Sequence, residues 1–472
     1  MLVSPRMAMT AAALLLTTGV MAGGSQRAAA GTPRSAAATP PPVTAQAWLG
    51  AGDTVNFSTT SAVYGTLEFG DGTETFVVGA GGVTHTYPAP GTYTATYLNG
   101  LGGPNETLLV TAGEDYTVRD GNGGYSFPVR VYQGTIPARG VVKISVAALS
   151  DGRATGYSSA MTDVLISGPR KAGTIAVYPD GAAQRAATAT AFRAGQSASG
   201  TALATVGADG RVDFANHSAA QVRITIYSTG VEVADPTKLG GFVYEPVRSV
   251  RVLAPKRVVA EGSTGLRVAG VDGINAKLAA VALDVTVSGT RAGSLVIGPD
   301  LYSMNDLDWA AGQRVTKLEI LPLEDRQDIG IGNDSAGSAV ISATVVGYFP
   351  WGPVDEGAAF LPVGPDTVEK VTIGARHTMQ VKISGRYGLP ATGVDAALVS
   401  LTAAGAAKAG TIEGWPAGTA RPNSPVLSYS ARATAVGAAQ IAVSSSGSFN
   451  LYNTGTRSVT VTITLTGAYY AG

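Results

Sequence analysis

Four short sequence markers recur three times in the same order after residue 128, and this repetition constrains the fold more than any other feature. The markers are a Pro-Val entry, an Ala-Gly pair whose Gly precedes a Pro by six residues, an aromatic residue and an Asn turn. The glycines Gly173, Gly293 and Gly410 lie 120 and 117 residues apart. A period this long exceeds that of solenoid repeats, so the pattern predicts three whole domains. The other markers are Pro128, Pro246 and Pro362; Phe192, Trp309 and Tyr429; and Asn216, Asn333 and Asn453.

Each copy has the pattern of short β-strands. Between Val459 and Leu465 the apolar residues alternate with Thr460, Thr462 and Thr464, which places the two sets on opposite faces of a strand. Only 14% of residues are charged and 62 are Gly, a composition typical of turn-rich β structure. We therefore expect an all-β protein with three tandem β-sandwich or jelly-roll-like domains at 120–233, 242–349 and 359–472. Linkers are expected near 234–241 and 350–358.

A smaller module precedes the repeats at residues 43–112. Turn signals at Gly70-Asp71-Gly72 and Pro90-Gly91 separate alternating stretches, which predicts another sandwich. The segment Leu67–Gly72, followed by His85-Thr86-Tyr87 and Pro90–Thr94, resembles the PKD domain, an immunoglobulin-like fold. The family usually has Trp-Asp where this chain has Leu67-Glu68, and Leu still suits a core position. The resemblance implies a spacer or a module that contacts protein or carbohydrate. His85 and Asp71 fit turn chemistry better than catalysis or metal binding.

The three repeats resemble a β-sandwich repeat of secreted actinobacterial proteins, often found beside exported cell-wall enzymes. Copies of that repeat end on an apolar strand and Gly-Tyr-Phe, which Gly347-Tyr348-Phe349 matches and Gly467-Ala468-Tyr469-Tyr470 matches loosely. The resemblance implies an architecture and an extracellular compartment, and no defined activity.

The N-terminus has the pattern of an export signal. Arg6 supplies a positive charge, Ala11–Met21 supplies a short apolar stretch, and Ala28–Ala30 supplies a small-residue cleavage site. We assign residues 1–30 to a signal peptide and 31–42 to a disordered linker. The apolar stretch is too short for a membrane span, so no membrane association is expected after its removal. The expected location is extracellular, with release to the medium.

The residue inventory argues against several chemistries. The 33 basic and 33 acidic residues balance, so the chain lacks the positive excess that nucleic-acid binding needs. No Cys is present, and His85, His217 and His377 are the three histidines, which disfavours zinc and nucleophilic catalysis. Asp120–Gly123 lacks the later Glu of an EF-hand and suits a turn. We expect no enzyme activity, metal or cofactor.

Carbohydrate or a cell-surface protein is the expected partner, because aromatic faces stack on sugar rings. The aromatic marker holds one repeat position and is expected in the core, whereas Trp415 and Trp351 are candidate ligand contacts at the surface. The favoured function is a non-catalytic secreted binding or adhesion protein. Two alternatives are a purely structural stalk or assembly subunit, and a secreted hydrolase with an unrecognised carboxylate site. What recurs between copies is turn and core chemistry, so any function is expected in what differs between them.

Overall fold

The computed structural model describes much of the chain from residue 43 onward. The described residues are 43–47, 54–59, 63–79, 81–88, 91–101, 105–112, 123–145, 157–183, 186–207, 210–233, 243–299, 307–323, 327–350, 357–361 and 363–471. The predicted signal peptide and linker, residues 1–42, lie outside this range, as does Trp351. Every regular element among the described residues is a β-strand, so the all-β prediction is confirmed.

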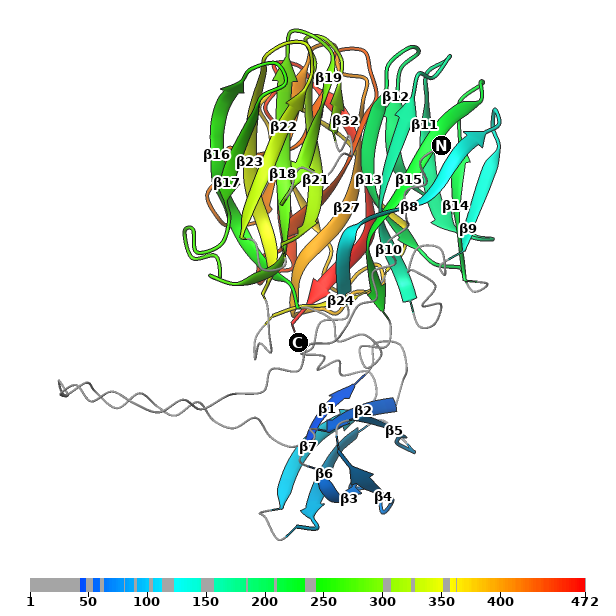
Figure 1. Ribbon diagram of the computed structural model, residues 1–472, viewed down its shortest axis with the longest axis vertical. Helices are drawn as coiled ribbons and strands as arrows, with labels where there is room; N and C mark the ends of the chain where they lie inside the picture. Colours follow the sequence, from blue (N-terminus) through cyan, green and yellow to red (C-terminus); the bar gives the residue numbers. More distant parts are fainter. Residues whose placement is uncertain are drawn as a thin grey trace, which may run out of the picture. The chain divides into compact units, whose positions relative to one another are not determined.

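The N-terminal module, residues 43–112, is a sandwich of two antiparallel sheets (Figure 1). One sheet has the order β1-β2-β5 and the other β4-β3-β6-β7. Its core holds Phe57, Leu67 and Tyr97, so Leu67 fills the core position that the sequence assigns to it. His85 lies in a strand that the sequence analysis did not predict. The strands are β1 (Val43–Ala47), β2 (Thr54–Thr59), β3 (Tyr64–Glu68), β4 (Glu74–Val78), β5 (Gly81–Thr86), β6 (Gly91–Asn99) and β7 (Glu106–Ala112).

Repeat 1 forms two four-stranded antiparallel sheets. The first sheet has the order β13-β10-β15-β8 and the second β12-β11-β14-β9. Numbered within the repeat, strands one, three, six and eight form the first sheet, which is the strand arrangement of a jelly roll. The strands are β8 (Gly123–Ile136), β9 (Val141–Ser145), β10 (Tyr157–Ser167), β11 (Gly173–Pro179), β12 (Ala187–Phe192), β13 (Ala198–Thr205), β14 (Arg211–Asn216) and β15 (Val222–Val233).

Repeat 2 has the same topology, strand for strand. Its first sheet is β16-β23-β18-β21 and its second sheet is β17-β22-β19-β20. The sequence prediction of a jelly-roll-like sandwich is therefore confirmed. The order of the strands in the two sheets could not be predicted from the spacing of the markers. The strands are β16 (Glu245–Val258), β17 (Ser263–Arg267), β18 (Leu278–Gly289), β19 (Gly293–Gly298), β20 (Leu307–Trp309), β21 (Arg314–Pro322), β22 (Asp328–Asp334) and β23 (Ala339–Pro350).

Repeat 3 differs only in its entry strand, which is broken into two segments that both pair with β32. Its first sheet is β24-β32-β27-β30, with β25 also on β32, and its second sheet is β26-β31-β28-β29. The strands are β24 (Ala359–Leu361), β25 (Asp366–Ile373), β26 (Thr378–Lys382), β27 (Val394–Ala404), β28 (Gly410–Pro416), β29 (Pro425–Tyr429), β30 (Ala435–Ala442), β31 (Ser448–Asn453) and β32 (Val459–Tyr470).

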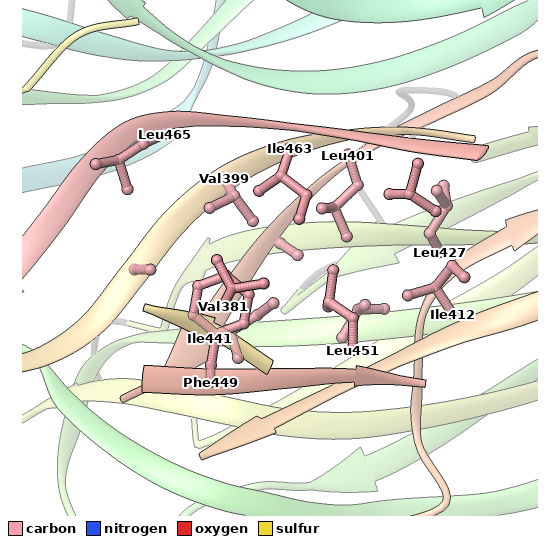
Figure 2. Close-up of a cluster of buried hydrophobic side chains, with 14 of the residues drawn as sticks. Val381, Val399, Leu401, Ile412, Leu427, Ile441, Phe449, Leu451, Ile463 and Leu465 are labelled. Carbon is pink, nitrogen blue, oxygen red and sulfur yellow. The ribbon is translucent and has the colours of Figure 1, made fainter. Parts of the chain in front are cut away.

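Each repeat buries its own core between its two sheets. In repeat 3, Val399 and Leu401 of β27 and Ile463 of β32 face Phe449 and Leu451 of β31 across the sandwich (Figure 2). Val459, Val461, Ile463 and Leu465 all belong to this core, so the face predicted from the alternation is confirmed. The β-branched residues suit the pleated surface, and their burial removes apolar area from water.

Candidate functional site

The Asn marker of each repeat forms the same set of hydrogen bonds within that repeat. Asn333 Nδ2 donates to the carbonyl oxygens of Val259 at 2.8 Å and Gly337 at 2.9 Å. These carbonyls belong to the turn after the first strand and the turn before the last, so the amide ties both turns together. The equivalent acceptors are Pro137 and Ala220 for Asn216, and Gly374 and Arg457 for Asn453.

The aromatic and glycine markers pack against each other. Phe192, Trp309 and Tyr429 are buried, which confirms the core prediction for this position. A Cβ added at Gly293 would lie 2.8 Å from the Trp309 ring and would overlap Ser335. Gly173 and Gly410 are crowded in the same way, by Phe192 with Ser218 and by Tyr429 with Gly455. The Asn, aromatic and Ala-Gly markers are therefore structural.

Trp415 does not lie at the surface, where the sequence analysis placed it. Its side chain is 6% exposed, and its indole Nε1 donates to the carbonyl of Thr419 at 3.1 Å. The turn that begins at Pro416 folds back over the ring and takes up its polar group. The placement of Trp415 at the surface is therefore corrected, and its role as a ligand contact stays a prediction.

The two turn residues singled out in the N-terminal module bind each other. His85 Nε2 lies 2.7 Å from Asp71 Oδ2, and the imidazole stacks on Phe69 at 3.9 Å between ring centroids. Burial alone would raise the pKa of Asp71, but hydrogen bonds from Thr73 and His85 lower it to about 2. The pair joins the Gly70-Asp71-Gly72 turn to strand β5.

The three repeats share a further hydrophobic core, which we call the shared core. It lies on the outer faces of the three first sheets and includes Met161 and Leu203 of repeat 1, and Leu398 of repeat 3. Tyr244 stacks on Tyr469 at 4.1 Å between centroids. The remaining members are Ala280, Ala282, Leu318, Ile320, Val346, Phe349, Ala358, Phe360, Ala396 and Ala438.

The end of the expected linker at 350–358 is part of the shared core. Ala358, at its end, is fully buried, and its backbone exchanges two hydrogen bonds with Tyr244. The Gly of Gly-Tyr-Phe also belongs here, because a Cβ at Gly347 would overlap the Tyr244 ring. The repeats are complete sandwiches that also pack on one another.

Contacts between neighbouring repeats run in one direction around a ring. Strand β13 of repeat 1 packs on β20 and β21 of repeat 2, β21 packs on β29 and β30 of repeat 3, and β30 packs on β12 and β13 of repeat 1. Such head-to-tail contacts close when the rotation between units completes a circle. A side-chain hydroxyl forms a hydrogen bond across each junction: Thr201 Oγ1 to Leu318 O at 2.9 Å, Thr316 Oγ1 with Ser428 Oγ at 2.8 Å, and Ser400 Oγ to Thr188 O at 2.7 Å.

A buried ionic cluster crosses the junction of repeats 1 and 2. Lys317 Nζ lies 3.0 Å from Asp163 Oδ2 and 2.9 Å from Glu319 Oε1, and all three side chains are at most 4% exposed. Asp308 lies close enough for Lys317 to affect its titration. Burial raises the pKa of Asp308 to about 6, against the opposing charge of Lys317.

Asp308 also borders a small polar cavity to which all three repeats contribute. Ser199 of repeat 1, Thr316 of repeat 2 and Ser428 of repeat 3 line it with Asp308, and its volume is about 70 Å³. Drug-sized ligands occupy pockets of roughly 300 Å³ or more, so this cavity is too small for a sugar ring.

Asp284 is a buried carboxylate that, within the described part of the chain, lacks the cation partner of its counterpart in repeat 1. Asp163 of β10 corresponds by register to Asp284 of β18 and Ser400 of β27. Among the described residues Asp284 has no hydrogen-bond partner for either carboxylate oxygen, and burial raises its pKa well above the usual value. The position of Lys317 is Gly437 in repeat 3, so the second junction lacks the cation that the first provides.

A groove has walls from repeats 2 and 3 and a volume of about 790 Å³. Its repeat 2 wall is the entry marker Pro246-Val247-Arg248, and Pro416–Thr419 of repeat 3 lies opposite. The other lining residues are Gln380, Asp395, Ala442, Val443, Ser444, Ser445 and Ser446. The groove therefore carries hydroxyls, an amide, one carboxyl and one guanidinium beside a few apolar side chains.

Neither of the two charged side chains in the groove has a partner among the described residues of the protein. Arg248 is exposed and Asp395 is half-buried, and within the described part of the chain neither side chain has a hydrogen-bond or ion-pair partner. Burial raises the pKa of Asp395. Asp395 stands at a β-bulge, since the register between β27 and β32 shifts between Val394 and Ala396. Bulges re-aim side chains and are frequent beside functional sites.

The other candidates found by residue type stay apart. His217 and His377 are exposed, and no group of three or more His, Asp or Glu suited to a metal occurs among the described positions. Over the same part of the chain, no helix is long and apolar enough to cross a membrane. Arg248 and Asp395 were not predicted from the sequence, although the Pro-Val marker lies in one wall of the groove.

Comparison with known proteins identifies the N-terminal module. Residues 42–111 match the PKD domain, so the chain contains a PKD domain where the resemblance placed it. No curated protein matched the chain. The solved structures that the chain resembles include two described as the atomic structure of Sulfolobus Turreted Icosahedral Virus and the triple jelly roll fold and turret assembly in an archaeal virus. Each is 11% identical over 81% of this chain, with 91% and 90% of those chains covered and TM-scores of 0.17 and 0.16.

Proposed function

We propose that this chain is a non-catalytic, secreted binding protein that presents its β-sandwich modules to cell-wall glycan or another polysaccharide. The observation that carries the proposal is the groove between repeats 2 and 3, which is open, polar and of ligand size. Hydroxyls, an amide, a carboxyl and a guanidinium are the groups that hydrogen-bond to sugar hydroxyls. The PKD domain and the jelly rolls fit a structural or binding module.

Retention of the protein on insoluble glycans tests this proposal. The mature full-length chain is incubated with purified cell wall, chitin and cellulose, and the bound fraction is compared with that of albumin. We expect the protein to be retained on at least one of these three glycans. Soluble fragments of the same glycan should compete for binding and reduce the retained fraction. No retention on any of them contradicts glycan binding.

Secretion is part of the same proposal and has its own test. It is supported by the charged, apolar and small-residue order at the N-terminus. Expression with the native N-terminus in a bacterial host should place the protein in the medium, with its mature N-terminus near Gly31. Full retention inside the cell contradicts an extracellular role.

The shared core favours a second candidate, a purely structural assembly subunit. Three jelly rolls that pack together through one common core suit a structural scaffold. Light scattering of the mature chain separates the two candidates, because an assembly subunit forms large particles at concentrations where a binding protein stays discrete.

A further inference from the structure

The walls of the groove come from markers that all three repeats contain. By strand register Pro246-Val247-Arg248 corresponds to Pro362-Val363-Gly364 in repeat 3 and to Tyr125-Ser126-Phe127 in repeat 1, just before the Pro-Val marker there. Pro416 corresponds to Pro179 and Pro299. Head-to-tail contacts recur at every junction, and the groove described above lies at the junction of repeats 2 and 3. What separates the three junctions is the chemistry of a few side chains.

The polar groups of the groove occur together at only one junction. Asp395, the bulge residue of β27, is Ala279 at the bulge of β18 and Ser158 at the bulge of β10. Gln380, opposite Asn450, corresponds to Gly265 and Lys143, which stand opposite Gly330 and Asp213. By the same register Arg248 corresponds to Phe127 in repeat 1, and repeat 3 has Gly364 there. Only the junction of repeats 2 and 3 combines a carboxyl, an amide and a guanidinium.

The unsatisfied groups indicate what the groove takes. Arg248 offers a fork of N–H donors and Asp395 offers two acceptor oxygens, and within the described residues neither is used by the protein. One positive and one negative group offset each other, so neither a polyanion nor a polycation is favoured. Vicinal hydroxyls of a sugar can bind both a carboxylate and a guanidinium at once, and the neighbouring Ser444–Ser446 add further hydroxyls.

We infer that the groove between repeats 2 and 3 is the single ligand site of the three-repeat body, and that it binds an uncharged, hydroxyl-rich glycan chain through Arg248, Asp395 and Gln380. This inference rests on the proposed function. The site is composite, because Arg248 comes from repeat 2 and the other two residues come from repeat 3. Trp415 is buried beneath the adjoining turn and is not among the residues that line the groove.

Isothermal titration of the full-length chain with soluble oligosaccharides of chitin, cellulose and xylan tests the inference. We expect one bound ligand per chain. Arg248→Ala and Asp395→Ala should each weaken binding about tenfold or more, because each removes a hydrogen bond to a charged group. Arg130→Ala is the control, since it removes an exposed arginine from the entry strand of repeat 1, outside the groove, and it should leave the affinity unchanged.

The outcomes distinguish the inference from the proposed function. Several ligands per chain, undiminished binding by Arg248→Ala and Asp395→Ala, or a loss in Arg130→Ala would overturn the assignment of the groove while leaving glycan binding intact. Binding confined to charged glycans overturns the ligand class. No binding to any oligosaccharide, together with no retention on insoluble glycans, overturns both. Asp395→Asn, which preserves the side-chain volume, guards against a loss caused by misfolding, and unfolding curves are recorded for every variant.

Discussion

At the scale of single residues, the junction of repeats 1 and 2 depends on Lys317. Its ammonium is the cation that contacts Asp163 and Glu319, and no more than 4% of any of these side chains is exposed. A buried ion pair adds little over a well-packed apolar substitute, but removal of one partner leaves the other charge buried and uncompensated. Loss of Lys317 is therefore far more costly than loss of a surface lysine.

We predict that Lys317→Met lowers the free energy of unfolding by about 3–5 kcal/mol. The control is Lys143→Met, which breaks the Lys143–Asp180 pair, where the lysine side chain is 52% exposed. Exposed pairs contribute about 0–1 kcal/mol, so the control should change little. Denaturant unfolding at neutral pH measures both variants, and equal effects would show that the buried cluster has no special role.

Asp308 gives the junction a dependence on pH. Its pKa is raised from 3.8 to about 6, so between these values the folded chain holds a proton that the unfolded chain has lost. This contribution to stability is complete below about pH 4 and is lost as pH rises through about 6. In Asp308→Asn the thermal unfolding temperature should therefore depend less on pH between pH 4 and 7 than it does in the wild type.

The control for this titration is Asp328→Asn, which changes an exposed aspartate of the same repeat. It should keep the pH profile of the wild type. If Asp308→Asn also kept the wild-type pH profile, the pH dependence of stability would have to come from another titratable group. Neither Asp308 nor Lys317 could be predicted as a junction residue from the sequence, because a buried charge and a surface charge have the same local pattern.

At the scale of strands and turns, the recurring markers connect elements within each repeat. The Ala-Gly marker starts the fourth strand, and its Gly leaves room for the aromatic of the fifth. The Asn marker ties the turn after the first strand to the turn before the last. This explains why turn and core chemistry persists between copies while exposed polar positions drift.

We predict that Gly293→Ala destabilises the protein by about 1–3 kcal/mol, because the added methyl group meets the Trp309 ring and Ser335. Gly265→Ala in the same repeat is the control. A Cβ there meets one carbonyl oxygen at 3.9 Å, so little change is expected. Thermal unfolding of both variants compares them directly, and a Gly293→Ala protein as stable as the wild type would contradict the packing argument.

Much of this level could be predicted from the sequence. The period, the aromatic core position and the inward face of Val459–Leu465 all follow from local alternation and spacing. The bulge that places Asp395 in the groove could not be predicted, because it appears only as a register shift between paired strands. Trp415 was misplaced because nothing in its own strand shows that the next turn folds back to Thr419.

At the scale of the whole molecule, the sequence predicted three separate sandwiches, and the shared core adds a level that it did not predict. The sign was present in β18, where nearly every residue from Leu278 to Val287 is buried. A strand covered on both faces shows an apolar run in place of alternation. The partner for the second face comes from other repeats, so periodicity within one copy could not identify it.

The shared core predicts that the three repeats unfold as one unit. Leu318 is fully buried, and its side chain contributes to the shared core. Leu318→Ala should cost about 2–5 kcal/mol through lost burial and the cavity left behind. Because the shared core joins the repeats, hydrogen-exchange protection should fall in β10 of repeat 1 and β27 of repeat 3 as well as in repeat 2.

The matched variant is Phe57→Ala, which opens a cavity in the separate core of the PKD domain. It should leave the protection of β10 and β27 unchanged. If Leu318→Ala lowered protection in repeat 2 alone, the repeats would be independent domains, and a groove built from two of them would lack a fixed geometry. The exchange pattern therefore tests the fold and the composite site together, since a ligand held by Arg248 and Asp395 requires both repeats in a fixed arrangement.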